Sequence, residues 1–152
     1  KYSMFYENYD KLLESKILKD LLLYRNLVHE DKIYLLNSNI SLNEGLFLFH
    51  LIKKYKPKNL LEIGLACGVS ASFMLLSMPS KSKLTSVDPF QKFQWDSFGL
   101  LVVAEIIKEN KLVKTNHKWI PYFSHTFFQS VAFLLDLHHL FFLLDVGRVV
   151  SF

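Results

Sequence analysis

Two acidic residues and a set of small residues stand at a spacing that suits nucleotide binding. Glu62 ends a short apolar run and is followed by Gly64, Ala66 and Gly68, and a second apolar run ends at Asp88. Small residues let a ligand approach the backbone, and the N–H groups at the start of a following helix add partial positive charge. A carboxylate at the end of the next strand is placed to accept hydrogen bonds from ribose hydroxyls. This succession of strand, glycine turn, helix and strand is typical of a nucleotide-binding α/β sheet.

The spacing of the glycines distinguishes between two nucleotide classes. The dinucleotide pattern G-x-G-x-x-G would need glycines at positions 64, 66 and 69, where the chain has Gly64, Ala66 and Val69. The pattern E-x-G-x-x-x-G, from Glu62 to Gly68, fits throughout. With LLEIGLACGVSASFML and LTSVDPFQ, it resembles the first motifs of class I S-adenosylmethionine (SAM)-dependent methyltransferases. The two segments are similar to a subgroup whose members often act on oxygens of small molecules or sugars.

The resemblance spans roughly residues 40–125 and implies a set of cofactor-binding residues. The segment ISLNEG followed by LFLFHLIKKYKPKN is similar to the helix that precedes the first strand in that family. Glu44 in this segment would lie near the ligand, although a helix-capping role is sufficient to explain it. The residues expected to bind SAM are Glu62, Gly64, Ala66, Gly68 and Asp88, with Glu44 as a sixth candidate.

Each of these residues also has a plain structural explanation. Glu62 would hold the ammonium group of the cofactor or order a water molecule, or it would be a solvated strand end. Gly64 and Gly68 would be ordinary turn glycines, and Asp88 would belong to a simple Asp-Pro turn. The surrounding motif favours the cofactor-binding interpretation over these alternatives.

Asp145 is the candidate for catalysis. It follows the apolar run FFLL and would lie at the carboxyl end of a strand, where α/β sheets place their chemistry. It would act as a base or a metal ligand, or be a solvated strand end; no metal site is predicted from the sequence. His117 and His125 could act as bases near pH 7, but surface or core positions are the more ordinary explanation. Phe90 and Trp95 follow Asp88 and would either stack on adenine or pack in the core or a lid.

The apolar periodicity and the turn residues predict the elements that position these side chains. Ser41 with Glu44 three residues later predicts a capping box, and Pro57 ends the helix that follows. The predicted helices cover residues 4–24, a weaker segment near 25–37, 42–56, 68–78, 97–110 and 124–137. The predicted strands cover residues 59–64, 84–88, 117–120 and 140–144. We therefore expect one α/β domain, with an N-terminal helical extension (1–39) and a Rossmann-like three-layer α/β/α core (40–152) around a mostly parallel sheet.

The number of strands leaves two hypotheses for function. The family sheet has more strands than the roughly four predicted here, so the expected core is incomplete, as in a C-terminally truncated or reduced domain. The closing residues DVGRVVSF also depart from the acidic, glycine and histidine cluster that the family often shows. The first hypothesis is methyl transfer to a small-molecule acceptor. The second is a non-catalytic cofactor-binding or interaction domain that self-associates through an open sheet edge.

Composition limits the remaining classes. Of 152 residues, 51% are hydrophobic and 21% are charged, as in a globular protein with one core. The formal net charge is +4, and the lysines at 53, 54, 56 and 58 cluster at a helix end, where they complement the helix dipole rather than form a nucleic-acid patch. The single cysteine, Cys67, excludes an internal disulfide and a multi-cysteine metal site. No membrane-spanning or signal segment is recognised, so the expected location is cytoplasmic, without a nucleic-acid or membrane partner.

Overall fold

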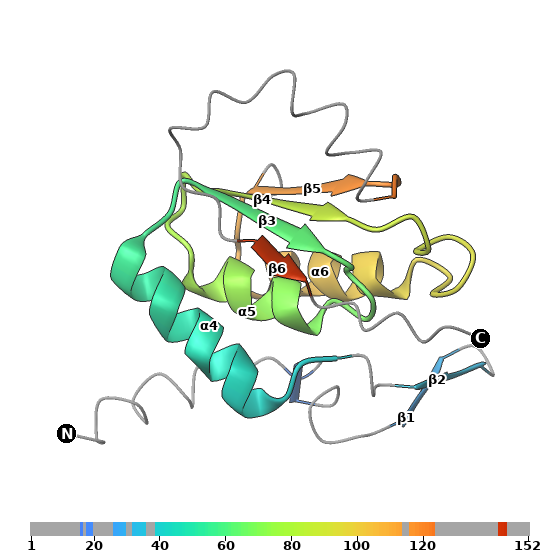
Figure 1. The fold of residues 1–152 in the computed structure, drawn as a ribbon. Helices are drawn as coiled ribbons and strands as arrows, with labels where there is room; N and C mark the ends of the chain where they lie inside the picture. The colour runs from blue at the N-terminus through green and yellow to red at the C-terminus, as the bar shows by residue number, and fades with distance from the viewer. Residues whose placement is uncertain are drawn as a thin grey trace.

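A parallel β-sheet with helices on one face forms the centre of the molecule (Figure 1). The computed structural model describes residues 16, 18, 19, 26–29, 32–35, 39–113, 116–123 and 143–145. The sheet strands are β3 (Asn59–Ile63), β4 (Lys83–Val87), β5 (His117–Ile120) and β6 (Leu143–Asp145). The helices that connect or precede them are α4 (Leu42–Tyr55), α5 (Val69–Ser77) and α6 (Phe98–Glu109). The predicted α/β, Rossmann-like class is confirmed.

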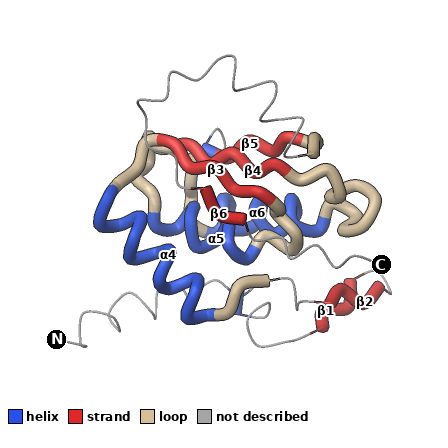
Figure 2. The backbone as a smooth tube through the Cα atoms, in the orientation of Figure 1, coloured by secondary structure: helices blue, strands red, loops and turns tan. Residues whose placement is uncertain are grey.

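The strand order determines where a ligand can bind. The sheet runs β5-β4-β3-β6, and every pairing is parallel. From β3 the chain moves outward to β4 and β5, and β6 then lies on the other side of β3, so the order reverses at β3. The strand arrows of Figure 1 all point toward one edge of the sheet, and Figure 2 shows the same strands in red. At this edge Ile63 pairs with both Val87 and Asp145. Ligands of open α/β sheets bind at such an edge, beside the strand where the order reverses.

The helix before the first sheet strand begins as its sequence predicts. The Ser41 N–H and Oγ–H both donate to the Glu44 carboxylate, at 2.7 and 2.8 Å, and Glu44 N–H donates to Ser41 Oγ at 3.3 Å. This reciprocal capping box satisfies donors that have no partner within α4. The helix ends at Tyr55, and Pro57 follows its left-handed C-cap residue, Lys56.

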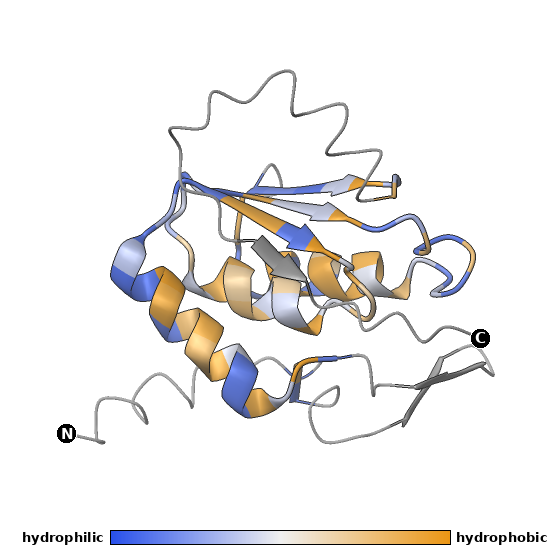
Figure 3. Cartoon of the chain, viewed as in Figure 1, coloured by the Kyte–Doolittle hydropathy of each residue, from blue (hydrophilic) through white to orange (hydrophobic). Residues whose placement is uncertain are grey.

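The core lies between the sheet and the three helices. Figure 3 shows α5 as mostly apolar, and eight of its nine residues are buried between α4, α6 and the sheet. In α4 and α6 the apolar residues alternate with polar ones, because only one face of each helix is covered. The described helices all lie on one face of the sheet (Figure 1). The second helical layer of the predicted three-layer arrangement is not among the described residues, and the helix predicted over 124–137 lies outside them.

The N-terminal segment differs from its sequence prediction. Residues near 25–37 were expected to be helical, but β1 (Asn26–His29) and β2 (Lys32–Leu35) form an antiparallel hairpin that is separate from the main sheet. The segment holds valine, isoleucine and tyrosine, which favour extended backbone, and its helical periodicity was weak. The helical extension is therefore wrong for these residues. Of the helix predicted over 4–24, the structure describes residues 16, 18 and 19, all helical.

The other predicted elements agree with the structure to within a few residues. Strands expected at 59–64, 84–88 and 117–120 are β3, β4 and β5, and helices expected at 68–78 and 97–110 are α5 and α6. The strand expected at 140–144 is described only as Leu143–Asp145. Within the described part of the chain, no helix is both long and apolar enough to cross a membrane.

Candidate functional site

The loop between β3 and α5 is a tight turn with three left-handed residues. Gly64, Ala66 and Gly68 have φ angles of 82°, 46° and 78°. The Gly64 N–H donates to the Val87 carbonyl at 2.9 Å, which ties the start of the loop to β4. Glycine adopts positive φ at little cost, so two of the three positions explain their residue type by backbone geometry alone. We call residues 64–68 the glycine loop.

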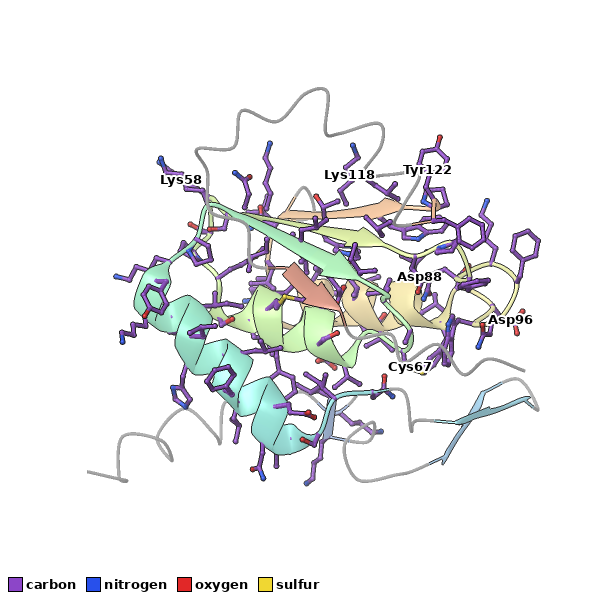
Figure 4. All side chains as sticks on the ribbon, in the orientation of Figure 1. Lys58, Cys67, Asp88, Asp96, Lys118 and Tyr122 are labelled. Carbon is purple, nitrogen blue, oxygen red and sulfur yellow. The ribbon has the colours of Figure 1, made fainter. Side chains whose placement is uncertain are left out.

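The carboxylate of Asp88 holds the glycine loop against the end of β4. Asp88 is only 3% exposed, and its Oδ2 accepts hydrogen bonds from the N–H groups of Leu65 and Ala66, both at 3.0 Å. Its Oδ1 accepts the N–H of Phe90 at 2.8 Å. Figure 4 shows Asp88 at the sheet edge toward which the strand arrows point. The carboxylate therefore joins the two segments that the sequence pattern had paired, through bonds to the loop backbone that the pattern did not specify.

Gln91 completes this junction and was not predicted from the sequence. Its side chain is fully buried, and its Nε2 donates to the Ala66 carbonyl at 2.8 Å and to Asp88 Oδ2 at 2.9 Å. Its Oε1 is buried without a hydrogen-bond partner. A glutamine three residues after a strand-end aspartate is a weak signal, since polar residues are common in such turns.

The glycine loop packs directly on the backbone of α6. A Cβ added to Gly99 would lie 2.2 Å from the Ala66 carbonyl oxygen, and one added to Gly68 would lie 2.9 Å from the Gly99 carbonyl oxygen. The absent side chain of Gly68 thus faces α6, so its small size serves helix packing rather than access for a ligand. Gly99 was missed, although a glycine inside an otherwise apolar helix signals a close approach.

Glu62 is buried beneath the loop. Its side chain is fully buried, its Oε1 accepts a hydrogen bond from the Ser70 hydroxyl, and its Oε2 accepts one from the Ser86 hydroxyl at 2.5 Å. Burial raises the pKa of the Glu62 carboxyl to about 7, although both serine hydroxyls act in the opposite direction. The carboxyl group joins β3, α5 and β4, and a contact with a ligand ammonium group stays a prediction.

His117 continues this buried hydrogen-bonded array into β5. Its Nε2 lies 3.0 Å from the Ser86 hydroxyl oxygen, and burial lowers the pKa of the imidazole to about 4. The neutral ring therefore dominates at pH 7, and its bond to Ser86 supports a structural role rather than a base. His125 lies outside the described residues.

The other predicted site residues are placed as follows. Glu44 is exposed and caps α4, so its proximity to a ligand stays a prediction. Asp145 pairs with Ile63 at the carboxyl end of β6, next to the start of the glycine loop. Cys67 is fully buried, and burial raises the pKa of its thiol to about 11, which makes it an unreactive core residue. Within the described residues, no group of three His, Cys, Asp or Glu side chains could hold a metal ion.

Aromatic residues lie in the segments that neighbour Asp88. Phe90 and Phe123 are 45% and 51% exposed, and their rings meet edge to face with centroids 5.7 Å apart. Trp119 donates its indole N–H to the Asp88 carbonyl at 2.8 Å, and Trp95 is half-buried. These rings offer apolar faces next to a carboxylate, which is an arrangement that suits a purine nucleoside.

The candidate site lies at the carboxyl ends of the strands, beside the glycine loop. Two grooves of the described surface lie elsewhere: one of about 290 Å³ borders α6 and His117, and one of about 240 Å³ lies between the end of α4 and that of α5. The first is lined by apolar side chains and His117, and the second by lysines, a serine and apolar residues. The glycine loop instead combines a buried carboxylate, helix N–H groups and aromatic faces. The glycine loop is therefore the candidate functional site.

Comparison with known proteins gives the same picture of the fold. A family model described as O-methyltransferase matches residues 8–106. Over 90 residues the chain is 30% identical to "Probable caffeoyl-CoA O-methyltransferase 3" of Dictyostelium discoideum. The matched region covers 59% of this chain and 34% of that protein.

Two solved structures share the fold at low identity. The O-methyltransferase from Bacillus cereus, in complex with SAH, has a TM-score of 0.55 and 14% identity, covering 91% of this chain and 54% of that one. The O-methyltransferase TomG from Streptomyces achromogenes, in complex with SAM, has a TM-score of 0.56 and 16% identity, covering 90% and 57%. The chain thus spans about a third of the curated relative and just over half of these structures.

Proposed function

Because the chain belongs to the O-methyltransferase family, we propose that it binds S-adenosylmethionine at the glycine loop and serves methyl transfer to an oxygen of a small molecule or sugar. The observation that carries the proposal is the junction of Asp88 with the glycine loop, at the edge beside β3 where the strand order reverses. The bound cofactor supplies a methyl group on a positively charged sulfur, which is already activated for transfer.

The nucleoside part of the cofactor is assigned to Asp88 and its aromatic neighbours. Asp88 Oδ2 is occupied by backbone and amide donors, whereas Oδ1 accepts only the Phe90 N–H. Oδ1 therefore has capacity to accept a bond from a ribose hydroxyl. Phe90, which is 45% exposed, and the half-buried Trp95 offer apolar surface for adenine.

The amino-acid part of the cofactor is assigned to the start of α5. Gly68 caps this helix without a side-chain hydrogen bond, and the first N–H groups of a helix have no partner within it. These groups favour an anion such as a carboxylate. Gly64, Ala66 and Gly68 shape the turn that presents them, and Glu62 supports it from below.

The acceptor hydroxyl must lose a proton, and Asp145 is the proposed base. The register of β6 places the backbone of Asp145 beside Ile63, the residue that directly precedes the glycine loop. A base there would act on an acceptor held in line with the methyl group, since orientation supplies much of the rate of such transfers. Asp145→Asn should lower the rate of transfer while leaving cofactor affinity unchanged.

Calorimetric titration with SAM, with S-adenosylhomocysteine and with NAD tests the proposal. We expect both sulfur-containing nucleosides to bind with a 1:1 stoichiometry and NAD to bind at least tenfold more weakly, because Val69 replaces the third dinucleotide glycine. Tighter binding of NAD, or no binding of either nucleoside, would contradict it.

A cofactor-binding module without catalysis is the second candidate. Among the described strands, β6 pairs on one side only, and an unpaired apolar strand invites pairing with another chain. This module would bind S-adenosylhomocysteine but show no methyl transfer to phenolic or sugar acceptors with radiolabelled SAM. Transfer by the isolated chain would exclude it.

A further inference from the structure

We infer that Gln91 is a positioning residue, whose amide clamps the glycine loop to Asp88 and leaves Oδ1 as the Asp88 oxygen that receives the cofactor. Its Nε2 bridges the Ala66 carbonyl and Asp88 Oδ2 from a fully buried position. The cofactor part of this inference rests on the proposed function, whereas the clamp itself is a property of the ligand-free chain.

The chemistry of its neighbours fixes which end of the amide faces the junction. Both groups within reach of Nε2, the Ala66 carbonyl and the Asp88 carboxylate, are acceptors. A reversed amide would place Oε1 against two other oxygens, and no donor would remain between them. A donor is therefore required at this position.

The Gln91 amide also gives the two oxygens of the Asp88 carboxylate different roles. Oδ2 accepts from Leu65 N–H, Ala66 N–H and Gln91 Nε2, and this leaves it no capacity for a further donor. Oδ1 accepts one N–H, from Phe90. Without the amide, the Ala66 carbonyl and Asp88 Oδ2 would both lose the donor that lies between them. The glycine loop would then lose one of the hydrogen bonds that hold it in place.

The unpartnered end of the amide supports this assignment. Gln91 Oε1 is buried without a hydrogen-bond partner, which is an unfavourable state that an apolar residue of similar size would avoid. A glutamine is thus explained here by its donor, not by packing alone. The Gln91 carbonyl also accepts the Ser97 N–H at 2.5 Å, so the same residue fixes the turn that leads into α6, on which the loop packs.

The test is Gln91→Glu, which keeps the shape but removes the donor, with the exposed Gln94→Glu as a matched control. Hydrogen exchange of the ligand-free chain at pH 8 should show protection of the Leu65 and Ala66 amides falling at least tenfold in Gln91→Glu. Protection of the remaining β3 and β4 amides should stay within threefold of wild type. In Gln94→Glu all of these amides should exchange as in wild type.

Affinity for S-adenosylhomocysteine supplies a second readout that a merely structural role would not move. At pH 8 we expect Gln91→Glu to bind at least tenfold more weakly than wild type. At pH 5.5 the loss should shrink to about threefold, because a protonated Glu at position 91 next to Asp88 again donates one hydrogen bond. Wild type measured at each pH corrects for titration of Glu62 and His117.

The two readouts separate failure of the clamp from failure of the cofactor site. Unchanged protection of the Leu65 and Ala66 amides in Gln91→Glu would overturn the inference, whatever binds. If wild type does not bind S-adenosylhomocysteine, the proposed function fails, and the exchange result still decides the clamp. If Gln91→Glu unfolds, Gln91→Met replaces it in the exchange test; unfolding of both variants would make Gln91 a core residue and overturn a positioning role.

Discussion

The Asp88 carboxylate accepts the loop N–H groups through Oδ2, and we propose that its Oδ1, which keeps capacity, binds the cofactor. Asp88→Ala should weaken binding of S-adenosylhomocysteine by about 1.5–3 kcal/mol, the scale of a hydrogen bond to a charged group. It should also lower the free energy of unfolding by about 2 kcal/mol, because the loop N–H groups lose their acceptor.

Titration calorimetry and urea denaturation measure the two effects separately. Glu105→Ala is the control, since this partly exposed carboxylate of α6 pairs only with Lys108 at 3.4 Å. Unchanged affinity for S-adenosylhomocysteine in a folded Asp88→Ala variant would show that Asp88 only stabilises the turn and does not bind the cofactor.

The raised pKa of Glu62 makes stability depend on pH with a definite sign. Because the pKa rises from 4.5 in the unfolded chain to about 7 in the folded one, the folded state holds the proton more tightly. The contribution of Glu62 to the free energy of unfolding is complete below pH 4.5 and is lost as pH rises to 7. The full contribution is roughly 3 kcal/mol. His117 has the opposite sign, since its pKa falls from 6.5 to about 4, so its contribution is complete above pH 6.5 and is lost as pH falls toward 4.

Glu62→Gln should therefore separate the effects of Glu62 and His117 on the pH dependence of stability. The variant keeps groups that can bond to Ser70 and Ser86. Between pH 4.5 and 6.5 its stability should rise with pH, because His117 is the one of these two buried groups that still titrates. Over the same range the wild type should change little, since the two contributions oppose each other. Urea denaturation at half-unit pH steps measures both curves, and parallel curves would show that Glu62 titrates alike in the folded and unfolded chains.

The sequence predicted the residue types of the site better than their tasks. Asp88 and the glycines were found because strand ends and tight turns leave a pattern in the sequence. The hydrogen bonds of Glu62 to two serines, and the orientation of Gln91, depend on contacts between residues that lie 3 to 25 positions apart in the chain. No periodicity encodes such contacts.

At the scale of elements, the contact between the glycine loop and α6 determines the position of the loop. Gly99→Ala should lower the free energy of unfolding by about 1–3 kcal/mol, because its Cβ would lie 2.2 Å from the Ala66 carbonyl oxygen. The backbone fixes the position of a Cβ, so no side-chain rotation can relieve this contact. This outcome reverses the usual gain from replacing a helical glycine by alanine, about 1 kcal/mol. Urea denaturation measures it.

Leu101→Ala on the same helix is the control, since Leu101 is 49% exposed and its truncation should have a small effect. Cofactor affinity should fall in Gly99→Ala and remain near wild type in Leu101→Ala. A stabilised Gly99→Ala variant with normal affinity would show that the loop and α6 do not touch as described.

Elements whose sequence signals are local were predicted well, and elements that depend on pairing with another strand were not. The capping box of Ser41 and Glu44, and Pro57 after the helix, placed α4 to within a residue. The hairpin β1–β2 was mistaken for helix because short apolar runs do not distinguish the two, and pairing between the strands decided the outcome.

At the scale of the whole molecule, the two outer strands of the described sheet differ in their tendency to recruit a partner. Lys118 in β5 is exposed, and a lysine on an edge discourages pairing with another chain. The sequence of β6, Leu-Leu-Asp, carries no such lysine. We therefore expect self-association through β6, with an apparent mass that rises with concentration in light scattering. A monomer at all concentrations, with full methyl-transfer turnover, would contradict this expectation.

The binding site itself is tested most directly by the backbone amide chemical shifts of the ¹⁵N-labelled chain on titration with S-adenosylhomocysteine. The largest changes should fall on the glycine loop, on Val69 and Ser70 at the start of α5, and on Phe90 next to Asp88. Residues lining the groove between α6 and His117 should change little, because that groove is lined by apolar side chains and His117. Changes centred on that groove, or no changes at saturating ligand, would contradict a cofactor site at the glycine loop.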